Sequence, residues 1–196
     1  MEASITLFLA SVKTICPGVT DEELSFFASR LNVVELQKKE LFVQSGKIQK
    51  AIGFIAKGLV RSYIIDRDGV ERTVGFYPEG EYATHYPAFI AQKPSLYTIQ
   101  CLEPTELVCL SFADIQSIYK TYPVFEQYGR LIAEEVLKQQ QARIESFVFQ
   151  NAEERYLDFM QQRPSLFNRV SLSQLCSYLG IERQTLTRIR HRIAHS

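Results

Sequence analysis

The chain has 196 residues with 22 basic and 22 acidic side chains, so its formal net charge is zero. Its composition, 46% hydrophobic and 22% charged, is that of an ordinary soluble protein with one main domain and a smaller one. No apolar run reaches the roughly 18 residues that cross a bilayer, and the first residues do not resemble a signal peptide. We therefore expect a cytoplasmic protein without membrane contact. The four cysteines are widely spaced, which favours buried thiols over an iron-sulfur cluster.

Residues 4 to about 30 carry a helical pattern. Thr20 followed by Glu23 is typical of a capping box, in which each side chain satisfies a backbone N–H at the start of a helix. Leu24, Phe27 and Leu31 follow at helical spacing. We expect these helices to contribute packing and no chemistry.

Between residues 33 and 111 the pattern changes to short runs of β-branched and aromatic residues. Four glycines, at positions 46, 58, 69 and 80, separate these runs at intervals of 12, 11 and 11 residues. Asp66–Gly69 is the clearest hairpin turn. The spacing predicts strands that fold back on one another in an antiparallel barrel or sandwich, with glycine where the backbone φ is positive. A barrel of this size has room for a small ligand.

Helical patterns return after residue 111. One predicted helix spans 112–122, and a longer one spans 125–149 with a broken apolar stripe. Such a long helix is either half of a subunit interface or packing for its own barrel. Asn151 with Glu154 then caps a further helix that ends before Pro164. We place a domain boundary near Gln150.

The last stretch, Val170–Ser196, predicts two short helices joined by a turn. Ser171 and Gln174 form a capping box, and Gly180 supplies the turn. In the second helix Leu186, Ile189 and Ile193 form an apolar seam that should face inward. The opposite face consists of hydrogen-bonding side chains: Gln184, Thr187, Arg188 and His191.

This pattern is typical of a helix-turn-helix, although an ordinary helical hairpin with a basic surface has the same spacing. The charge distribution favours DNA binding: residues 163–196 hold six arginines and one glutamate, a local charge of +5 in a neutral chain. Arg pairs with guanine and Gln with adenine, so we predict that Arg183, Gln184 and Arg188 read bases. The side chains predicted to hold phosphates are Arg190, Arg192 and Ser171.

The order of barrel, long helix and terminal helix-turn-helix resembles the cyclic-AMP receptor protein and fumarate-nitrate regulator (CRP/FNR) family of bacterial transcription factors. The resemblance covers nearly the whole chain and is most specific in GFIAKGLVRSYIIDRDG and LGIERQTLTRIR. It implies an α+β fold with an N-terminal β-barrel or jelly-roll sensor, and a homodimeric regulator that binds double-stranded DNA. The implied divisions are a sensor domain at 1–122, a dimerisation helix at 123–150 and a DNA-binding domain at 151–196.

The stretch that resembles the family's cyclic-nucleotide cassette departs from its pattern. Thr84, His85 and Tyr86 stand where Gly-Glu-Leu is usual, and Ser95 and Leu96 stand at the Arg-Ser pair. Without that arginine a cyclic phosphate loses its bidentate partner, which argues against cyclic AMP as the ligand. Haem is an alternative supported only by His85, and the effector stays unknown. The effector-pocket candidates are Tyr82, Thr84, His85, Tyr86, Ser95 and Tyr97.

Two other functions compete with transcription regulation. A small-molecule-binding sensor or scaffold that acts through protein partners would share the barrel but would bind DNA without sequence preference. A metal-dependent barrel enzyme would need several histidines and a carboxylate converging on a metal, and only His85 lies within the barrel segment. We therefore predict no enzyme and no metal site.

Overall fold

The computed structural model describes residues 2–194. Its helices are α1 (Glu2–Ile15), α2 (Asp21–Ala28), α3 (Tyr86–Ala91), α4 (Phe112–Thr121), α5 (Pro123–Phe149), α6 (Ala152–Gln162), α7 (Leu172–Leu179) and α8 (Arg183–Ala194), with a 3-10 turn at Pro164–Leu166. Its strands are β1 (Asn32–Leu36), β2 (Leu41–Val43), β3 (Ala51–Lys57), β4 (Val60–Ile65), β5 (Glu71–Tyr77), β6 (Tyr82–Ala83), β7 (Thr98–Cys101) and β8 (Thr105–Ser111).

The strands form two antiparallel four-stranded sheets, ordered β1-β8-β3-β6 and β2-β7-β4-β5. We call these sheet A and sheet B. Apolar side chains from both sheets, including Ile55, Leu107 and Ile99, meet in the core between them. The predicted α+β fold with an antiparallel barrel is confirmed. The glycines at 46, 58, 69 and 80 all have positive φ, between 78° and 102°, as the spacing predicts.

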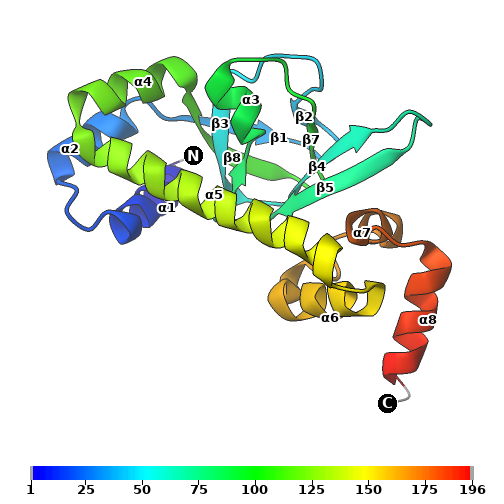
Figure 1. Cartoon of the computed structure of the whole chain (residues 1–196). Helices are drawn as coiled ribbons and strands as arrows, with labels where there is room; N and C mark the ends of the chain where they lie inside the picture. The colour runs from blue at the N-terminus through cyan, green and yellow to red at the C-terminus, as the bar shows by residue number, and fades with distance from the viewer. Residues whose placement is uncertain (1, 195–196) are drawn as a thin grey trace.

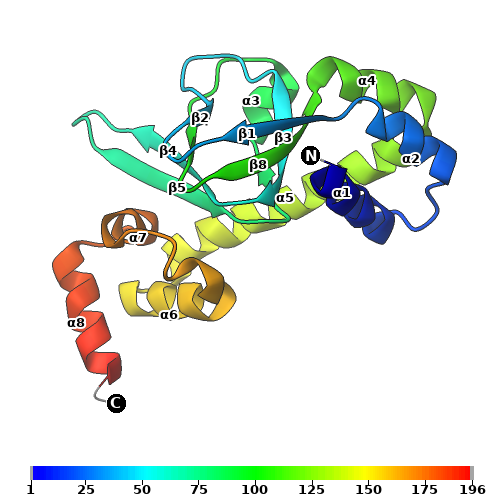
Figure 2. The same ribbon diagram turned by 180° about the vertical axis from the view of Figure 1, so that it is seen from behind.

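The outer face of sheet A is covered by helices. Phe54 and Val108 of this sheet pack in one buried cluster with Phe8 of α1, Phe27 of α2 and Phe125 of α5. Figure 1 shows α5 running along the molecule from α4 to α6. Figure 2 shows α1 and α2 beside the sheets, at the same end of the molecule as α4. The expectation that the N-terminal helices serve as packing agrees with this arrangement.

The helix starts follow the local sequence closely. The capping boxes predicted at Thr20, Asn151 and Ser171 are all present, each with the expected reciprocal bond from the residue three positions on. The hairpin at Asp66–Gly69 joins β4 to β5, and Asp66 accepts hydrogen bonds from the N–H groups of Asp68 and Val70. Short-range side-chain chemistry therefore fixes these boundaries.

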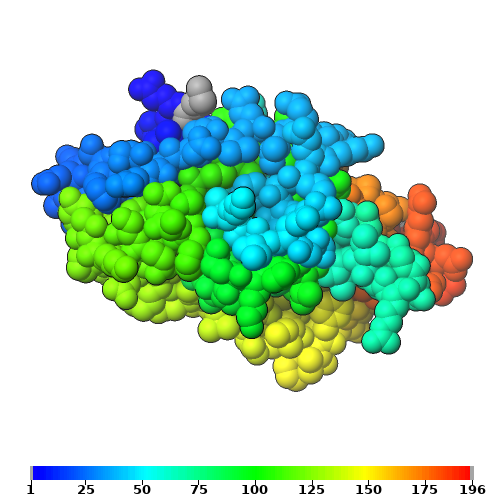
Figure 3. All heavy atoms as spheres, turned by 90° about the horizontal axis from the view of Figure 1, so that it is seen from above, coloured from blue at the N-terminus to red at the C-terminus, as the bar shows by residue number. Residues whose placement is uncertain are grey.

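The C-terminal helices α7 and α8, orange and red in the view from above, lie at the opposite end of the molecule from the blue N-terminal helices (Figure 3). Helix α6 packs with them in one buried cluster. Their core includes Tyr156, Leu175 and Leu186. Leu59 and Phe76 of the barrel belong to the same buried cluster. The described part of the chain contains no helix that is long and apolar enough to cross a membrane.

Candidate nucleic-acid interface

The turn between α7 and α8 depends on Gly180. Its φ is +66°, and its N–H donates to the carbonyls of Cys176 and Ser177, which closes α7. A Cβ at this position would lie 2.7 Å from the Phe147 ring at the end of α5. Glycine therefore serves both a left-handed backbone and a close approach between α5 and the turn.

One side of α8 is buried against the other C-terminal helices. Leu186 is fully buried and Ile189 nearly so, in a cluster with Tyr156 and Leu175. The predicted seam is wrong at its last position, because Ile193 is 38% exposed. All side chains from His191 to Ala194 are exposed, so the apolar contact ends one turn before α8 does.

The opposite side of α8 faces solvent, as predicted for Gln184, Thr187, Arg188 and His191. The hydroxyl of Thr187 donates to the carbonyl of Arg183 at 3.0 Å, so only its oxygen lone pair remains for another donor. Within residues 2–194 no side chain pairs with Gln184 or with Arg188. These two side chains keep their full hydrogen-bonding capacity for an outside molecule.

Three of the other predicted DNA-binding residues, Arg190, Arg192 and Ser171, have contacts within the protein. Arg190 donates to the Tyr156 hydroxyl at 3.2 Å and stacks its guanidinium on Phe167, so it holds α8 against α6. Arg192 forms an ion pair with Glu153 at 2.5 Å. Ser171 caps α7 by accepting from the N–H of Gln174 at 3.3 Å. Arg183 lies exposed at the start of α8.

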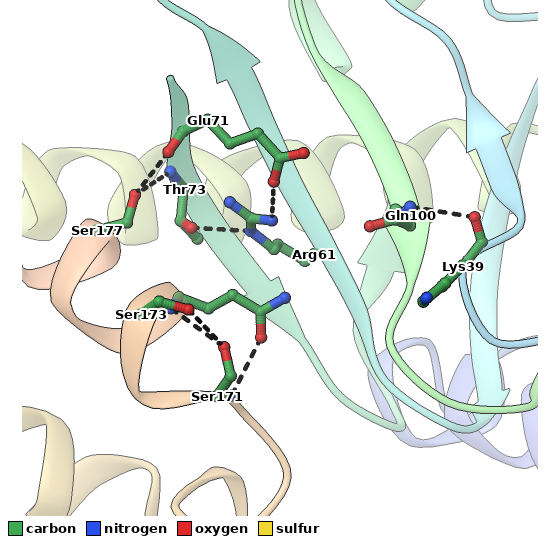
Figure 4. A network of polar contacts seen from close by, with 9 residues as sticks. Lys39, Arg61, Glu71, Thr73, Gln100, Ser171, Ser173 and Ser177 are labelled. Atoms are coloured by element: carbon green, nitrogen blue, oxygen red, sulfur yellow. Dashed lines mark hydrogen bonds and ion pairs between the residues drawn. The ribbon is translucent and has the colours of Figure 1, made fainter. Parts of the chain in front are cut away.

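α7 is anchored to the barrel by Ser177. Its hydroxyl donates to the carbonyl of Glu71 at 3.1 Å and accepts from the N–H of Thr73 at 2.8 Å, as Figure 4 shows. The buried Arg61 pairs with the Glu71 carboxylate and the Thr73 hydroxyl from the neighbouring strand. A polar network thus joins the edge of sheet B to the helix that precedes the turn.

The predicted effector-pocket residues fall into two groups. Thr84, His85, Ser95 and Tyr97 form a polar cluster with Gln49, which the sequence did not single out. Gln49 is 4% exposed and binds Thr84 and the N–H of His85, 35 and 36 residues away. Nothing local in the sequence marks this long-range partner.

Within this cluster the side chains of Ser95 and His85 form hydrogen bonds with protein atoms. Ser95 donates to the carbonyl of Tyr97 at 2.8 Å, so its contact of 3.1 Å with His85 Nδ1 requires that Nδ1 carry the hydrogen. The His85 ring stacks on Tyr97 at 4.1 Å, and burial lowers the pKa of His85 below its usual value. Above pH 6.5, His85 is therefore a neutral imidazole whose Nε2 is an acceptor.

Tyr82 and Tyr86 lie elsewhere. Successive residues of a strand point to opposite faces, so Tyr82 turns toward the helices while Ala83 lies in the core between the sheets. The Tyr82 hydroxyl pairs with that of Tyr128 on α5, and both tyrosines border an apolar cavity together with Tyr86. The six candidates therefore do not share one pocket.

The cassette offers no cation to a phosphate. Ser95 is 1% exposed and committed to His85 and Tyr97, while Lys93 lies at the surface. In the part of the chain that the structure describes, no three His, Cys, Asp or Glu side chains gather as a metal site would require.

Comparisons with known proteins find similarity over most of the chain. The family model "Cyclic nucleotide-binding domain" matches residues 33–122. The electron transport regulator A of Shewanella oneidensis is 28% identical over 82% of this chain and 68% of its own. The cyclic AMP receptor protein of Thermus thermophilus is 24% identical over 92% of this chain and 83% of its own.

A solved structure adds the arrangement in space. The crystal structure of the Thermus thermophilus catabolite activator protein has a TM-score of 0.58 at 19% identity, covering 92% of this chain and 86% of the other. The fold is therefore shared from the barrel to the C-terminal helices.

Proposed function

We propose that this chain is a DNA-binding transcription regulator of the CRP/FNR type and that it reads a pseudo-palindromic DNA site as a homodimer. The observation that carries this proposal is the exposed face of α8. Arg188 and Gln184 project from it without a partner in residues 2–194, while Leu186 and Ile189 fix the other side. A helix held in this way can enter the major groove as a rigid body.

The two side chains suit base recognition for different reasons. The guanidinium of Arg188 can donate two parallel hydrogen bonds to guanine O6 and N7. The amide of Gln184 can donate to and accept from adenine, where the family pattern has a glutamate that accepts from cytosine. We expect the preferred site to differ from that of the family pattern at the base facing Gln184.

The residues proposed to hold phosphates also have contacts within the protein. Ser171 lies at the positive N-terminal end of α7, where backbone N–H groups favour an anion. Arg190 supports α8 through Tyr156 and Phe167 and presents only part of its guanidinium. The Arg192 guanidinium would contact a phosphate only if it released the Glu153 carboxylate or bound both groups at once.

The partner subunit is proposed to pack along α5. Leu137, Ile144 and Val148 are 69%, 58% and 66% exposed, and they lie 7 and 4 residues apart on one helix face. Large apolar side chains repeated at this spacing are typical of a helix that pairs with a second helix. A two-fold dimer would present two copies of α8 to successive turns of the duplex. The division into 1–122, 123–150 and 151–196 and the cytoplasmic location remain part of this proposal.

The effector of this protein is proposed to be something other than cyclic AMP. Thr84, His85 and Ser95 are bonded to protein partners, and Lys93 lies outside the cluster. To ligate a haem iron, the His85 ring would have to leave its contacts with Ser95 and Tyr97 or bind the iron through Nε2 alone. A thermal-shift measurement with cyclic AMP tests this point: no change in Tm is expected, and a saturable rise would overturn it.

Selection of binding sites from random double-stranded DNA tests the function itself. We expect enrichment of a two-fold symmetric sequence with half-sites about one helical turn apart. Binding that is purely salt-dependent, with no enriched sequence, would instead favour the sensor or scaffold that acts through protein partners.

A further inference from the structure

An apolar cavity lies between sheet A and its covering helices, outside the core that fills the space between the two sheets. Its volume is about 110 Å³. Its walls come from α1, α2, α3, α4, α5 and sheet A. Figure 1 shows α3, α4 and the first part of α5 near this sheet. It is distinct from the polar cluster of Thr84, His85 and Ser95, none of which lines it.

The cavity is larger than ordinary packing defects. Protein interiors contain few voids larger than a water molecule. An apolar cavity of about 150 Å³ in another protein stays dry and takes up benzene. Ile90 of α3 is 54% exposed and Gln116 of α4 is also exposed, and both line the cavity. They mark a mouth through which a small molecule can enter.

The lining selects for a neutral ligand. Within the described residues the wall consists of aliphatic and aromatic side chains, one glycine and one amide, with no charged group. A charged ligand would lose its hydration and gain no ionic partner. The aromatic rings of Phe8, Phe89 and Phe112 offer faces and edges to a flat ring.

A pair of hydrogen-bonded hydroxyl groups is part of the wall. The hydroxyls of Tyr82 on β6 and Tyr128 on α5 are bonded to each other. Burial raises the pKa of Tyr128 to about 12, so this phenol stays neutral at physiological pH. Whichever hydroxyl donates, a lone pair remains on the pair of oxygens, and it can accept a hydrogen bond from a ligand hydroxyl.

The cavity also borders the start of α5. Phe125, Tyr128 and Ile132 line it, and so does Gly129, where a Cβ would collide with the Tyr119 hydroxyl of α4. A molecule in the cavity would therefore contact α4 and the first turns of α5 at once.

From these observations we propose that this cavity is a binding site for a neutral monocyclic aromatic molecule with one hydroxyl group, of which phenol is the smallest. The ring fills the apolar space and the hydroxyl donates to the Tyr82–Tyr128 pair. The proposal concerns the protein without DNA, so its outcome is independent of whether α8 reads bases.

Titration of the full chain tests the site, with phenol, benzene and benzoate as probes and with ligand-observed NMR and Tm as readouts. We expect saturable binding of phenol, affinity about fivefold weaker for benzene because one neutral hydrogen bond is lost, and none for benzoate. Replacing both tyrosines, Tyr82→Phe together with Tyr128→Phe, removes both acceptor oxygens and should weaken phenol binding while leaving benzene binding nearly unchanged.

Two cavity-filling variants locate the site. Ile132→Phe and Ile115→Phe place extra atoms in the cavity from half-buried positions, and each should weaken phenol binding by at least about tenfold. Leu7→Phe, at an exposed position of α1 that does not line the cavity, should bind as the unchanged chain does.

The proposal is overturned if phenol does not bind saturably, if benzoate binds as well as phenol, or if both filling variants retain full affinity. If one filling variant does not fold, the other carries the comparison. If neither folds, contacts between phenol protons and the Tyr128 ring in the unchanged chain decide the location.

Discussion

Arg169 donates two hydrogen bonds, of 2.9 and 2.8 Å, to the carboxylate of Glu79. The same guanidinium reaches Glu103 at 3.3 and 2.6 Å. Arg169 follows the 3-10 turn after α6, whereas both glutamates lie in turns of the barrel. These bonds raise the pKa of Arg169, so it stays charged. One arginine therefore clamps the C-terminal helices to two turns of the barrel.

Replacement of this arginine should weaken the attachment. Arg169→Gln removes a charged fork that is only 23% exposed and leaves two carboxylates facing each other. We expect the free energy of unfolding to fall by about 1 to 2 kcal/mol and Tm to fall by a few degrees. Denaturant unfolding measures the change. Arg130→Gln, in an exposed pair with Glu134, is the control and should cost about 0.5 kcal/mol or less.

The same clamp gives a pH dependence. Burial would raise the pKa of Glu79, but the bonds from Arg169 outweigh it and hold the pKa below the ordinary value of 4.5. A lowered pKa in the folded state means stability that is present above pH 4.5 and is lost as the pH falls through the folded value. In acid the unchanged chain should lose more stability than Arg169→Gln. Parallel loss in both proteins would contradict this role of the pair.

His85 predicts a second pH effect, nearer neutrality. Burial lowers its pKa below the ordinary 6.5, so the folded state disfavours the imidazolium. The contribution is present above pH 6.5 and is lost as the pH falls through the folded value. His85→Asn keeps a donor near the Nδ1 position but does not titrate. Between pH 7.5 and 5.5, Tm should fall more for the unchanged chain than for His85→Asn.

Substitution of Gly180 tests how much stability is lost to a steric clash in addition to the loss from an unfavourable backbone conformation. Gly180→Ala meets a positive φ and places Cβ 2.7 Å from the Phe147 ring. Gly69→Ala is the matched control, because its φ is +78° and no atom lies within 4 Å of the added Cβ. We expect about 1 kcal/mol of lost stability at Gly69 and roughly 2 kcal/mol at Gly180. Equal losses would mean that Phe147 moves aside without cost.

The subunit interface can be tested on α5. Ile144→Glu puts a charge on the exposed apolar face, and burial of that charge in a dimer would be costly. Sedimentation velocity should give a dimer for the unchanged chain and a monomer for the variant, with weaker DNA binding by the monomer. Gln139→Glu adds a charge on the same helix outside the Leu137–Ile144–Val148 face and should leave the dimer intact. A dimer that persists in Ile144→Glu would move the interface elsewhere.

The elements that the sequence predicted correctly depend on short-range chemistry. Thr20, Asn151 and Ser171 cap helices through residues three positions away, and glycines at positive φ mark turns regardless of the rest of the fold. The exposed face of α8 follows from helical periodicity alone. Ile193 departs from that periodicity because the helix outruns its packing partners.

Contacts between residues far apart in the sequence could not be predicted in the same way. Gln49 reaches Thr84 across 35 residues, and Arg169 reaches Glu79 across 90, so no local pattern joins them. The separation of Tyr82 from Ser95 does have a sequence signal. Strand alternation turns Tyr82 away from the core between the sheets, although a two-residue strand is too short to be recognised beforehand.

The most direct test of the central claim compares Arg188→Ala and Arg188→Lys with the unchanged chain in binding-site selection over a range of salt concentrations. If Arg188 reads guanine, both variants lose preference at one base of each half-site, because lysine keeps the charge but not the fork. The expected loss is about 1 to 3 kcal/mol for the preferred sequence. If Arg188→Lys kept the full sequence preference and Arg188→Ala weakened all sequences equally, Arg188 would be a phosphate contact and the assignment of α8 as the reader through this residue would be wrong.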